Sequence, residues 1–308
     1  MEKYDVIIIG GGPAGLTSGL YTARARIKTL LLEKGTPGGQ ASMTELIENY
    51  PGFPQGISGL DLMLNFQEQA TRFGLEMRYQ EVIEIGLDQV LKQVKTEENC
   101  YQARAVIISS GAAPRKLGIT GEEQFTGRGV SYCATCDGAF FQDQTVAVVG
   151  GGDAAVEEAV YLTRFAQTVY LIHRRGALRA ARVVQERAFN NPKIRFLWHT
   201  AVKEIQGKQK VEKLILENLQ DNQISELNVN GVFIYIGVDP NTRFLQQRIT
   251  LSPEGYIETN NQLETSVPGI FAAGDVRNKE LRQVSTAVGD GALAALAVER
   301  YLAAETKI

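Results

Sequence analysis

The chain contains one structural unit twice, and this repeat restricts its fold more than any other feature. Residues 5–33 and residues 146–173 share one pattern: an apolar run, a glycine-rich stretch, a run of small residues and a second apolar run. Continuous apolar strands of this kind are typical of parallel sheets that are covered on both faces. The repeat therefore predicts an α/β fold with two Rossmann-like, three-layer nucleotide-binding domains.

The glycine-rich stretches have the spacing of a dinucleotide-binding turn. The first glycine permits a tight turn, the second lets the backbone approach a pyrophosphate, and a third small residue lets the helix pack on its strand. The phosphate then binds the free amides at the start of the helix. One such turn is weak evidence, but both copies lie between a strand and a helix. The predicted contacts are Gly10, Gly12, Pro13, Ala14 and Gly15 in the first turn, and Gly150, Gly152, Asp153, Ala154 and Ala155 in the second.

The residue at the end of each second strand distinguishes the two sites. Glu33 ends the first unit, where a carboxylate accepts hydrogen bonds from ribose hydroxyls. His173 has the matching place in the second unit and is followed by Arg174, Arg175 and Arg179. Guanidinium groups bind a 2′-phosphate that a carboxylate would repel. The first site is predicted to take FAD or an NAD-like cofactor and the second NADP; the alternative is that these arginines are a solvated helix start.

Charge and hydropathy exclude several classes of protein. The formal net charge of −3 does not indicate a basic surface that would bind nucleic acid or an anionic membrane. No apolar run approaches the roughly 20 residues that a membrane helix requires. The N-terminus runs directly into a strand-like segment without the features of a secretory signal. We therefore expect a cytoplasmic protein with neither a nucleic-acid nor a membrane partner.

Cys133 and Cys136 form a C-x-x-C between the two repeats. In a reducing compartment this spacing is typical of a catalytic or metal-binding pair. A disulfide between them opens and forms readily, and Asp137 is placed to move the accompanying proton. Zinc needs four ligands, and no second C-x-x-C or C-x-x-H pair supplies them, so no metal is expected. Cys100 is interpreted as a buried structural thiol.

Five motifs together resemble the low-molecular-weight bacterial thioredoxin reductases, from the first strand to the final helix. They are the stretches 10–15, 133–137, 150–155, 173–179 and 265–275, in the order of that family. The chain departs from the family pattern at Ala154, at 109–110 and at 289–292, where it reads Gly-Asp-Gly-Ala.

The resemblance implies a discontinuous FAD domain, residues 1–114 and 242–308, with an NADPH domain, 115–241, inserted into it. It also implies a homodimer in which the NADPH domain rotates, presenting first the disulfide and then the nicotinamide to the flavin. Cys136 would face the flavin, Cys133 would attack thioredoxin, and Asp137 would be the acid/base. Beyond the first turn and Glu33, the FAD site would include Gly39, Gln40, Asn49, Asp275, Arg282, Gln283 and Val284.

Arg128, Phe140 and Phe141 match positions that contact thioredoxin in that family. The alternative for them is a solvated charge and a pair of core aromatics.

Three other functions stay open for a chain with these motifs. One is a related flavoenzyme reduced by ferredoxin, which the arginine cluster after His173 disfavours. Another uses NADPH but serves a different protein disulfide, such as that of a peroxide-reducing partner. The third is a sensor that binds FAD and NADP(H), turns over negligibly and signals through a partner.

Overall fold

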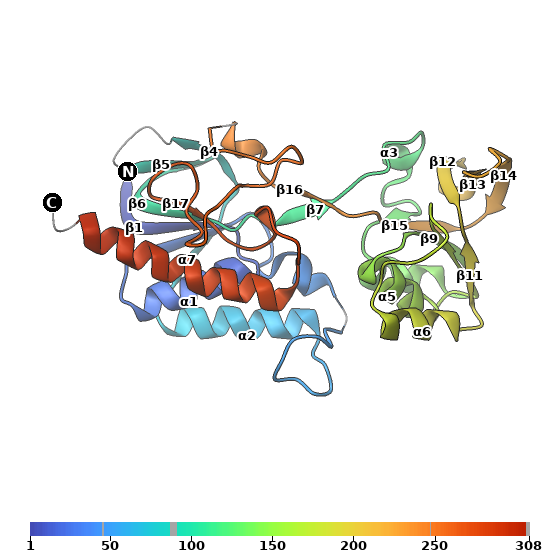
Figure 1. Ribbon diagram of the computed structural model, residues 1–308, viewed down its shortest axis with the longest axis horizontal. Helices are drawn as coiled ribbons and strands as arrows, with labels where there is room; N and C mark the ends of the chain where they lie inside the picture. Colours follow the sequence, from blue (N-terminus) through green and yellow to red (C-terminus); the bar gives the residue numbers. More distant parts are fainter. Residues whose placement is uncertain (45, 87–90, 247, 306–308) are drawn as a thin grey trace. The chain divides into compact units, whose positions relative to one another are not determined.

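The chain folds into two compact units. The computed structural model describes residues 1–44, 46–86, 91–246 and 248–305 (Figure 1). Residues Met1–Ala113 and Asp239–Ile308 form the first unit, and Pro114–Val238 form the second. The first unit is therefore built from both ends of the chain, and the second from its middle.

A seven-stranded sheet is the centre of the first unit. Its order is β3-β2-β1-β6-β5-β4, and β17 also pairs with β6. β1, β2, β3, β6 and β17 pair in parallel, whereas β4 and β5 form an antiparallel extension. The strands are β1 (Glu2–Ile9), β2 (Thr29–Glu33), β3 (Glu76–Tyr79), β4 (Val82–Gly86), β5 (Lys92–Thr96), β6 (Cys100–Ile108) and β17 (Ile270–Ala272).

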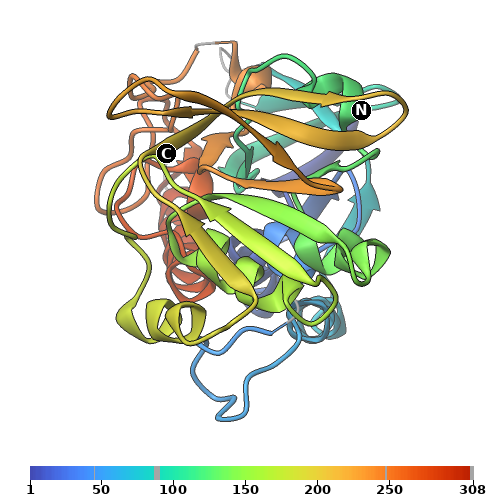
Figure 2. The same ribbon diagram turned by 90° about the vertical axis from the view of Figure 1, so that its right-hand side faces the viewer.

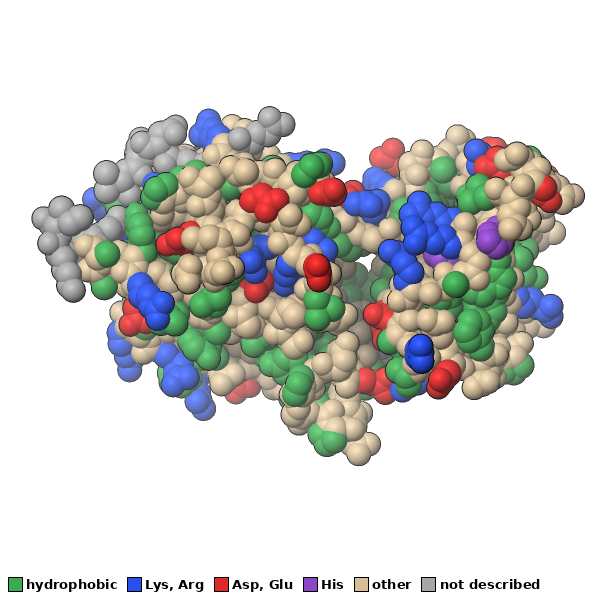
Figure 3. All heavy atoms as spheres, in the orientation of Figure 1, with side chains coloured by type: hydrophobic (Ala, Val, Ile, Leu, Met, Phe, Trp, Pro, Cys, Tyr) green, Lys and Arg blue, Asp and Glu red, His purple; other side chains and the backbone are tan. Residues whose placement is uncertain are grey.

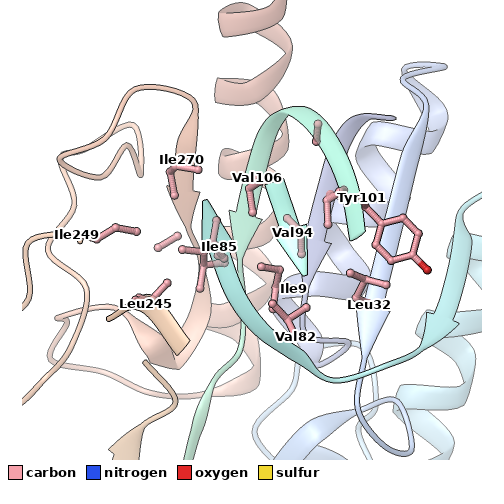
Figure 4. Close-up of a cluster of buried hydrophobic side chains, with 14 of the residues drawn as sticks. Ile9, Leu32, Val82, Ile85, Val94, Tyr101, Val106, Leu245, Ile249 and Ile270 are labelled. Atoms are coloured by element: carbon pink, nitrogen blue, oxygen red, sulfur yellow. The ribbon is translucent and has the colours of Figure 1, made fainter. Parts of the chain in front are cut away.

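Both faces of this sheet are covered, which explains its continuous apolar strands. Val6 and Ile8 belong to the core cluster shared with the helices α1 (Pro13–Arg24) and α7 (Val284–Glu305), and α2 (Gly59–Arg72) lies on the same side (Figure 1). On the opposite face Ile9 packs in the cluster of Figure 4, with residues of β4 and β5 and with Leu245 and Ile249 from the C-terminal part of the chain. Side chains that alternate along one strand thus enter two separate cores.

Small residues let α1 and α7 approach closely. Ser18 Oγ donates a hydrogen bond to the carbonyl oxygen of Gly291 at 3.0 Å. A Cβ atom at Gly291 would overlap the carbonyl oxygen of Ala14 in the first turn of α1. The last helix therefore lies beside the start of the first, although 273 residues separate the bonded pair in sequence.

The second unit repeats the plan with a five-stranded parallel sheet, ordered β11-β10-β9-β15-β8. A three-stranded antiparallel sheet covers it on the side away from α5 and α6 (Figure 2). The parallel strands are β8 (Val130–Ser131), β9 (Thr145–Gly150), β10 (Thr168–Ile172), β11 (Ile194–Leu197) and β15 (Gly231–Tyr235). The others are β12 (Thr200–Gly207), β13 (Val211–Asn218), β14 (Ile224–Asn228), and the helices α3 (Glu122–Phe125), α4 (Ala134–Asp137), η2 (Gly138–Phe141), α5 (Asp153–Leu162) and α6 (Arg182–Phe189). Two nucleotide-binding folds of the α/β class are thus confirmed.

The two segments that join the units pair with each other. β7 (Ala112–Pro114) and β16 (Val238–Pro240) form a two-stranded sheet. Beside it, Ser110 and Asn241 exchange two hydrogen bonds of 2.8 Å between side chain and backbone. Short 3₁₀ turns complete the first unit: η1 (Gly39–Met43), η3 (Arg243–Leu245) and η4 (Gly274–Val276). Within the described residues, no helix has the length and apolar character that a bilayer crossing demands.

Candidate active site

The first glycine turn joins β1 to α1 and leaves room for a phosphate. Gly10 has φ +100°, and a Cβ there would overlap the carbonyl of Ser109. Gly12 is the N-cap of α1, and a Cβ at this position would meet no atom within 4 Å. Pro13, at the first helical position, has no N–H to leave unsatisfied. The amides at the start of α1 therefore border an open space, as an anion site requires.

Alanine replacements at Gly12 and Gly15 should affect different properties, FAD binding for Gly12 and stability for Gly15. The Cβ of Gly15→Ala would overlap the Gly10 carbonyl oxygen, so we expect the free energy of unfolding to fall by about 1–3 kcal/mol. Gly12→Ala meets open space and should unfold like the parent, yet its methyl group should weaken FAD binding. Thermal unfolding and FAD titration of both variants check this. Equal stability of the two would contradict the close packing of the turn.

Glu33 and Gly39 lie against the same turn. Glu33 Oε2 accepts a hydrogen bond from the Gly11 amide at 2.6 Å, and its Oε1 accepts one from Gly35 at 3.1 Å. The Gly38 amide donates to the Gly11 carbonyl at 2.8 Å, and a Cβ at Gly39 would lie 3.5 Å from Gly12 Cα. The neighbouring Gln40 is exposed in η1.

The C-terminal part of the chain supplies the other side of this site. A Cβ at Gly274 would lie 2.9 Å from Ala14 Cβ, which places the Gly274–Asp275 turn beside the start of α1. Asn49 Nδ2 donates to Gln283 Oε1 at 3.1 Å, just before α7 begins at Val284. The predicted residues of the first site, distant in sequence, therefore gather in one unit.

Buried polar atoms in this region fit a ligand rich in hydroxyl groups and ring heteroatoms. Among the described residues, neither Asp275 Oδ1 nor Arg282 Nε has a hydrogen-bond partner, although both atoms are buried. Burial raises the pKa of Asp275, and Lys279 and Arg282 oppose that shift. The Arg282 guanidinium lies 4.0 Å from the ring centre of Tyr256, which holds it by cation–π contact. Buried groups without partners are costly, so they are expected where a bound molecule supplies the missing bonds.

The second turn, between β9 and α5, holds the arginine-rich loop that follows β10. Asp153 Oδ1 accepts a hydrogen bond from the Ala181 amide at 2.6 Å. The Arg179 amide donates to the Gly151 carbonyl at 2.7 Å. Gly152 again faces open space, whereas Ala155 is buried against the strand and Ala154 is exposed. The loop is thus fixed beside the amides that would bind a pyrophosphate.

His173 is buried at the carboxyl end of β10, and the arginines after it are exposed. A Cβ at Gly151 would overlap the His173 ring, and Trp198 meets that ring edge-on. Burial lowers the pKa of His173, and its Nε2 has no partner among the described residues. Figure 3 shows basic side chains gathered beside the two histidines of the chain. The exposed arginines are Arg174, Arg175 and Arg179.

The redox turn lies between β8 and η2 in the second unit. Cys133 and Cys136 are joined by a disulfide, and their Cα atoms are 5.3 Å apart. Cys133 Sγ accepts a hydrogen bond from the Cys136 amide at 3.2 Å and lies 3.3 Å from Thr135 Oγ1. Cys136 is exposed, whereas Cys133 and Asp137 are half-buried. Hydrogen-bond donors around one sulfur favour its thiolate, so Cys133 is suited to be the nucleophile once the disulfide opens.

Tyr235 supports the redox turn from the end of β15, a contact that the sequence did not indicate. Its hydroxyl accepts a hydrogen bond from the Ala134 amide at 2.7 Å. Ala134 is fully buried between the two cysteines. Burial, with the carboxylates of Glu158 and Asp137 nearby, raises the pKa of Tyr235, which keeps the phenol neutral.

Tyr235→Phe should therefore destabilise the second unit without changing its packing. The Ala134 amide would be left buried without an acceptor, at a cost of about 1–3 kcal/mol in the free energy of unfolding. Denaturant unfolding of the variant measures this directly. Tyr170→Phe, on strand β10 of the same sheet, is a matched control that should change stability little. Parent-like stability of Tyr235→Phe would contradict the contact.

Two expectations from the sequence need correction. Phe141 is buried, and its ring meets Phe233 edge-on at 5.4 Å, so of the expected pair only Phe140, 76% exposed, is open to a partner. Arg128 is exposed as well, and its Nη2 donates to the Gln124 carbonyl. Cys100, expected in the core, is only half-buried because it starts β6, opposite Lys95 at the edge of the pairing with β5.

Two nucleotide-binding folds, one with a redox disulfide, define a nucleotide-dependent disulfide oxidoreductase. The family model described as pyridine nucleotide-disulphide oxidoreductase matches residues 4–291. The chain therefore belongs to this family.

Relatives with known names resemble the chain over nearly its whole length. A thioredoxin reductase of Bacillus subtilis is 51% identical over 97% of this chain and 95% of that protein. The crystal structure of Lactococcus lactis thioredoxin reductase is 46% identical, with a TM-score of 0.96 over 98% of this chain and 99% of that one. A ferredoxin-flavin thioredoxin reductase from Clostridium acetobutylicum is 28% identical, with a TM-score of 0.56 over 100% of both chains. The family and the thioredoxin reductases of Bacillus subtilis and Lactococcus lactis imply FAD and NADPH as the cofactors.

Proposed function

We propose that this protein is an NADPH-dependent thioredoxin-disulfide reductase. The observation that carries the proposal is the Cys133–Cys136 disulfide, which occupies the unit that also holds the arginine loop beside the second glycine turn. The names of the relatives from Bacillus subtilis and Lactococcus lactis support thioredoxin as the substrate. When bound, FAD accepts the hydride of NADPH and passes two electrons to a nearby disulfide.

The first unit is the proposed FAD domain and the second the proposed NADPH domain. In the first, the amides at the start of α1 would bind the pyrophosphate, Glu33 the ribose, and Asp275 a hydroxyl group of FAD. Gly39, Gln40, Asn49, Arg282, Gln283 and Val284 would complete that site. In the second, the amides at the start of α5 would bind the pyrophosphate of NADPH. His173, Arg174, Arg175 and Arg179 would hold its 2′-phosphate.

The two cysteines carry out the exchange with thioredoxin. Two electrons and two protons convert the disulfide into two thiols, and loss of one proton gives the Cys133 thiolate. This thiolate attacks one sulfur of the thioredoxin disulfide, and the departing sulfur takes a proton for which Asp137 is the proposed donor. Cys136 then loses its proton and attacks Cys133 Sγ in the mixed disulfide. The thioredoxin sulfur leaves and takes up a proton, which gives reduced thioredoxin and restores the Cys133–Cys136 bond.

Exposed surfaces support two further parts of the proposal. Phe140 and Arg128 would contact thioredoxin, because both are exposed on the unit that carries the disulfide. A second copy of the chain would cover the apolar groove between α1 and α7, where Tyr21, Leu293 and Leu296 are exposed. The homodimer would act in the cytoplasm, where thiols are kept reduced.

Turnover assays with the purified yellow protein test the proposal. We expect NADPH to support repeated thioredoxin reduction, and reduced ferredoxin to fail as the donor. Binding of FAD and NADPH with negligible turnover would favour the sensor instead. Turnover with ferredoxin alone, or with another protein disulfide and not thioredoxin, would favour the remaining alternatives.

A further inference from the structure

Four charged side chains, three of them nearly buried, form a cluster beside the proposed FAD site. We name this group the Asp290 cluster; it contains Asp275, Arg277, Lys279 and Asp290. Asp290 Oδ1 lies 2.9 Å from Arg277 Nη1, and its Oδ2 lies 3.1 Å from Lys279 Nζ. The side chains of Arg277, Lys279 and Asp290 are only 14%, 12% and 16% exposed, whereas that of Asp275 is 37% exposed. Two carboxylates and two cations therefore balance in charge, and three of the four are largely closed to water.

Asp290 acts on Asp275 through two routes. It fixes the backbone, because its Oδ2 accepts a hydrogen bond from the Gly274 amide at 3.0 Å. It also holds Lys279, whose Nζ lies closer to Asp290 than to Asp275 Oδ1, at 3.5 Å. That Asp275 oxygen is buried and accepts no hydrogen bond among the described residues. Lys279 thus forms a long ion pair with Asp275, while its shorter contact is with Asp290.

Without the Asp290 charge, Lys279 would have one strong partner left. A buried ammonium without its carboxylate is costly, and it moves to the nearest available anion. That anion is Asp275, so the lysine would move from its long ion pair into a direct hydrogen bond with the oxygen that now accepts none. A hydroxyl group of a ligand would then have to displace a buried ion pair.

We propose that Asp290 is a positioning residue for FAD: it keeps the ion pair between Lys279 and Asp275 Oδ1 long, at 3.5 Å, so that this oxygen can accept a hydrogen bond from a hydroxyl group of the cofactor. The proposal rests on the proposed function of the first unit as the FAD domain. It gives a role to the aspartate in the Gly-Asp-Gly-Ala stretch at 289–292, where the chain departs from the family pattern.

Release of FAD from the holoprotein tests this role without measuring activity. Recovery of flavin fluorescence on dilution gives the dissociation constant for the parent, Asp290→Asn, Lys279→Met and the double variant. Asn retains an acceptor for the Gly274 amide, so the substitution removes mainly the charge. We expect Asp290→Asn to bind FAD about 10- to 100-fold more weakly, as expected when a supporting partner is lost. The double variant should bind FAD at least about tenfold more tightly than Asp290→Asn, because no lysine remains to occupy Asp275.

Glu68→Gln is the control for the loss of a negative charge. It neutralises an exposed carboxylate on α2 and should release FAD like the parent. If Asp290→Asn fails to fold by circular dichroism, the double variant, in which two opposite charges are removed, still decides the question. Parent-like affinity in Asp290→Asn, or a double variant that binds as weakly as Asp290→Asn, would overturn the proposal. Failure of the parent itself to bind FAD would instead overturn the proposed function.

Discussion

Cys136→Ser should abolish thioredoxin reduction while NADPH still bleaches the yellow colour of the protein. The substitution leaves both glycine turns intact but removes the disulfide. NADPH would therefore still reduce FAD, but the electrons could not pass from FAD to a disulfide. Loss of a reacting nucleophile lowers turnover by roughly a thousandfold or more. Stopped-flow absorbance with NADPH and steady-state turnover with thioredoxin measure the two halves separately.

Cys100→Ser is the matched control for this experiment. Cys100 is a free, half-buried thiol in the first unit, so its replacement should leave turnover near that of the parent. Retained thioredoxin turnover in Cys136→Ser would show that electrons do not need the Cys133–Cys136 disulfide to reach thioredoxin.

Replacing Arg174 and Arg175 together with alanine should remove most of the preference for NADPH over NADH. Both side chains are exposed in the loop that Asp153 fixes beside the second turn. A charge-assisted hydrogen bond contributes about 1.5–3 kcal/mol, so the loss of two predicts a KM for NADPH raised by roughly a hundredfold or more. The KM for NADH should change little, because NADH has no 2′-phosphate.

Arg182→Ala controls for the general loss of positive charge. Arg182 is exposed at the start of α6, close in sequence but outside the predicted phosphate site. Its replacement should leave the ratio of the two KM values unchanged. A parent protein that used NADH as well as NADPH would contradict the assignment of this loop.

The fold was predictable because its signals are local and repeated. Each nucleotide unit is a continuous segment in which strand, turn and helix follow one another, so residues such as Gly15 and Ala155 show their role by spacing alone. The same spacing identified Glu33, and its carboxylate does lie at the first turn. Burial on both faces of β1 likewise follows from an uninterrupted apolar run.

Contacts between distant segments were not predictable from the residues. Tyr235 ends an apolar strand and has no motif of its own, and only the fold brings its hydroxyl to the Ala134 amide. Asp290 was visible as a departure from the family pattern, but its partners Arg277 and Lys279 precede α7 and meet it only after folding. Phe140 and Phe141 are adjacent and chemically alike, so sequence could not show that one is exposed and the other buried.

Counting thiols before and after reduction tests the central claim most directly. The chain has three cysteines, and the oxidised form should show one reactive thiol after denaturation, that of Cys100. After anaerobic NADPH is added to the holoprotein, the count should rise to the three thiols that the sequence contains. After NADPH is removed, oxidised thioredoxin should return the count on this chain to one thiol while thioredoxin's own disulfide becomes reduced. A count that stays at one thiol in NADPH, or that stays at three after thioredoxin is added, would contradict the proposed route of electrons.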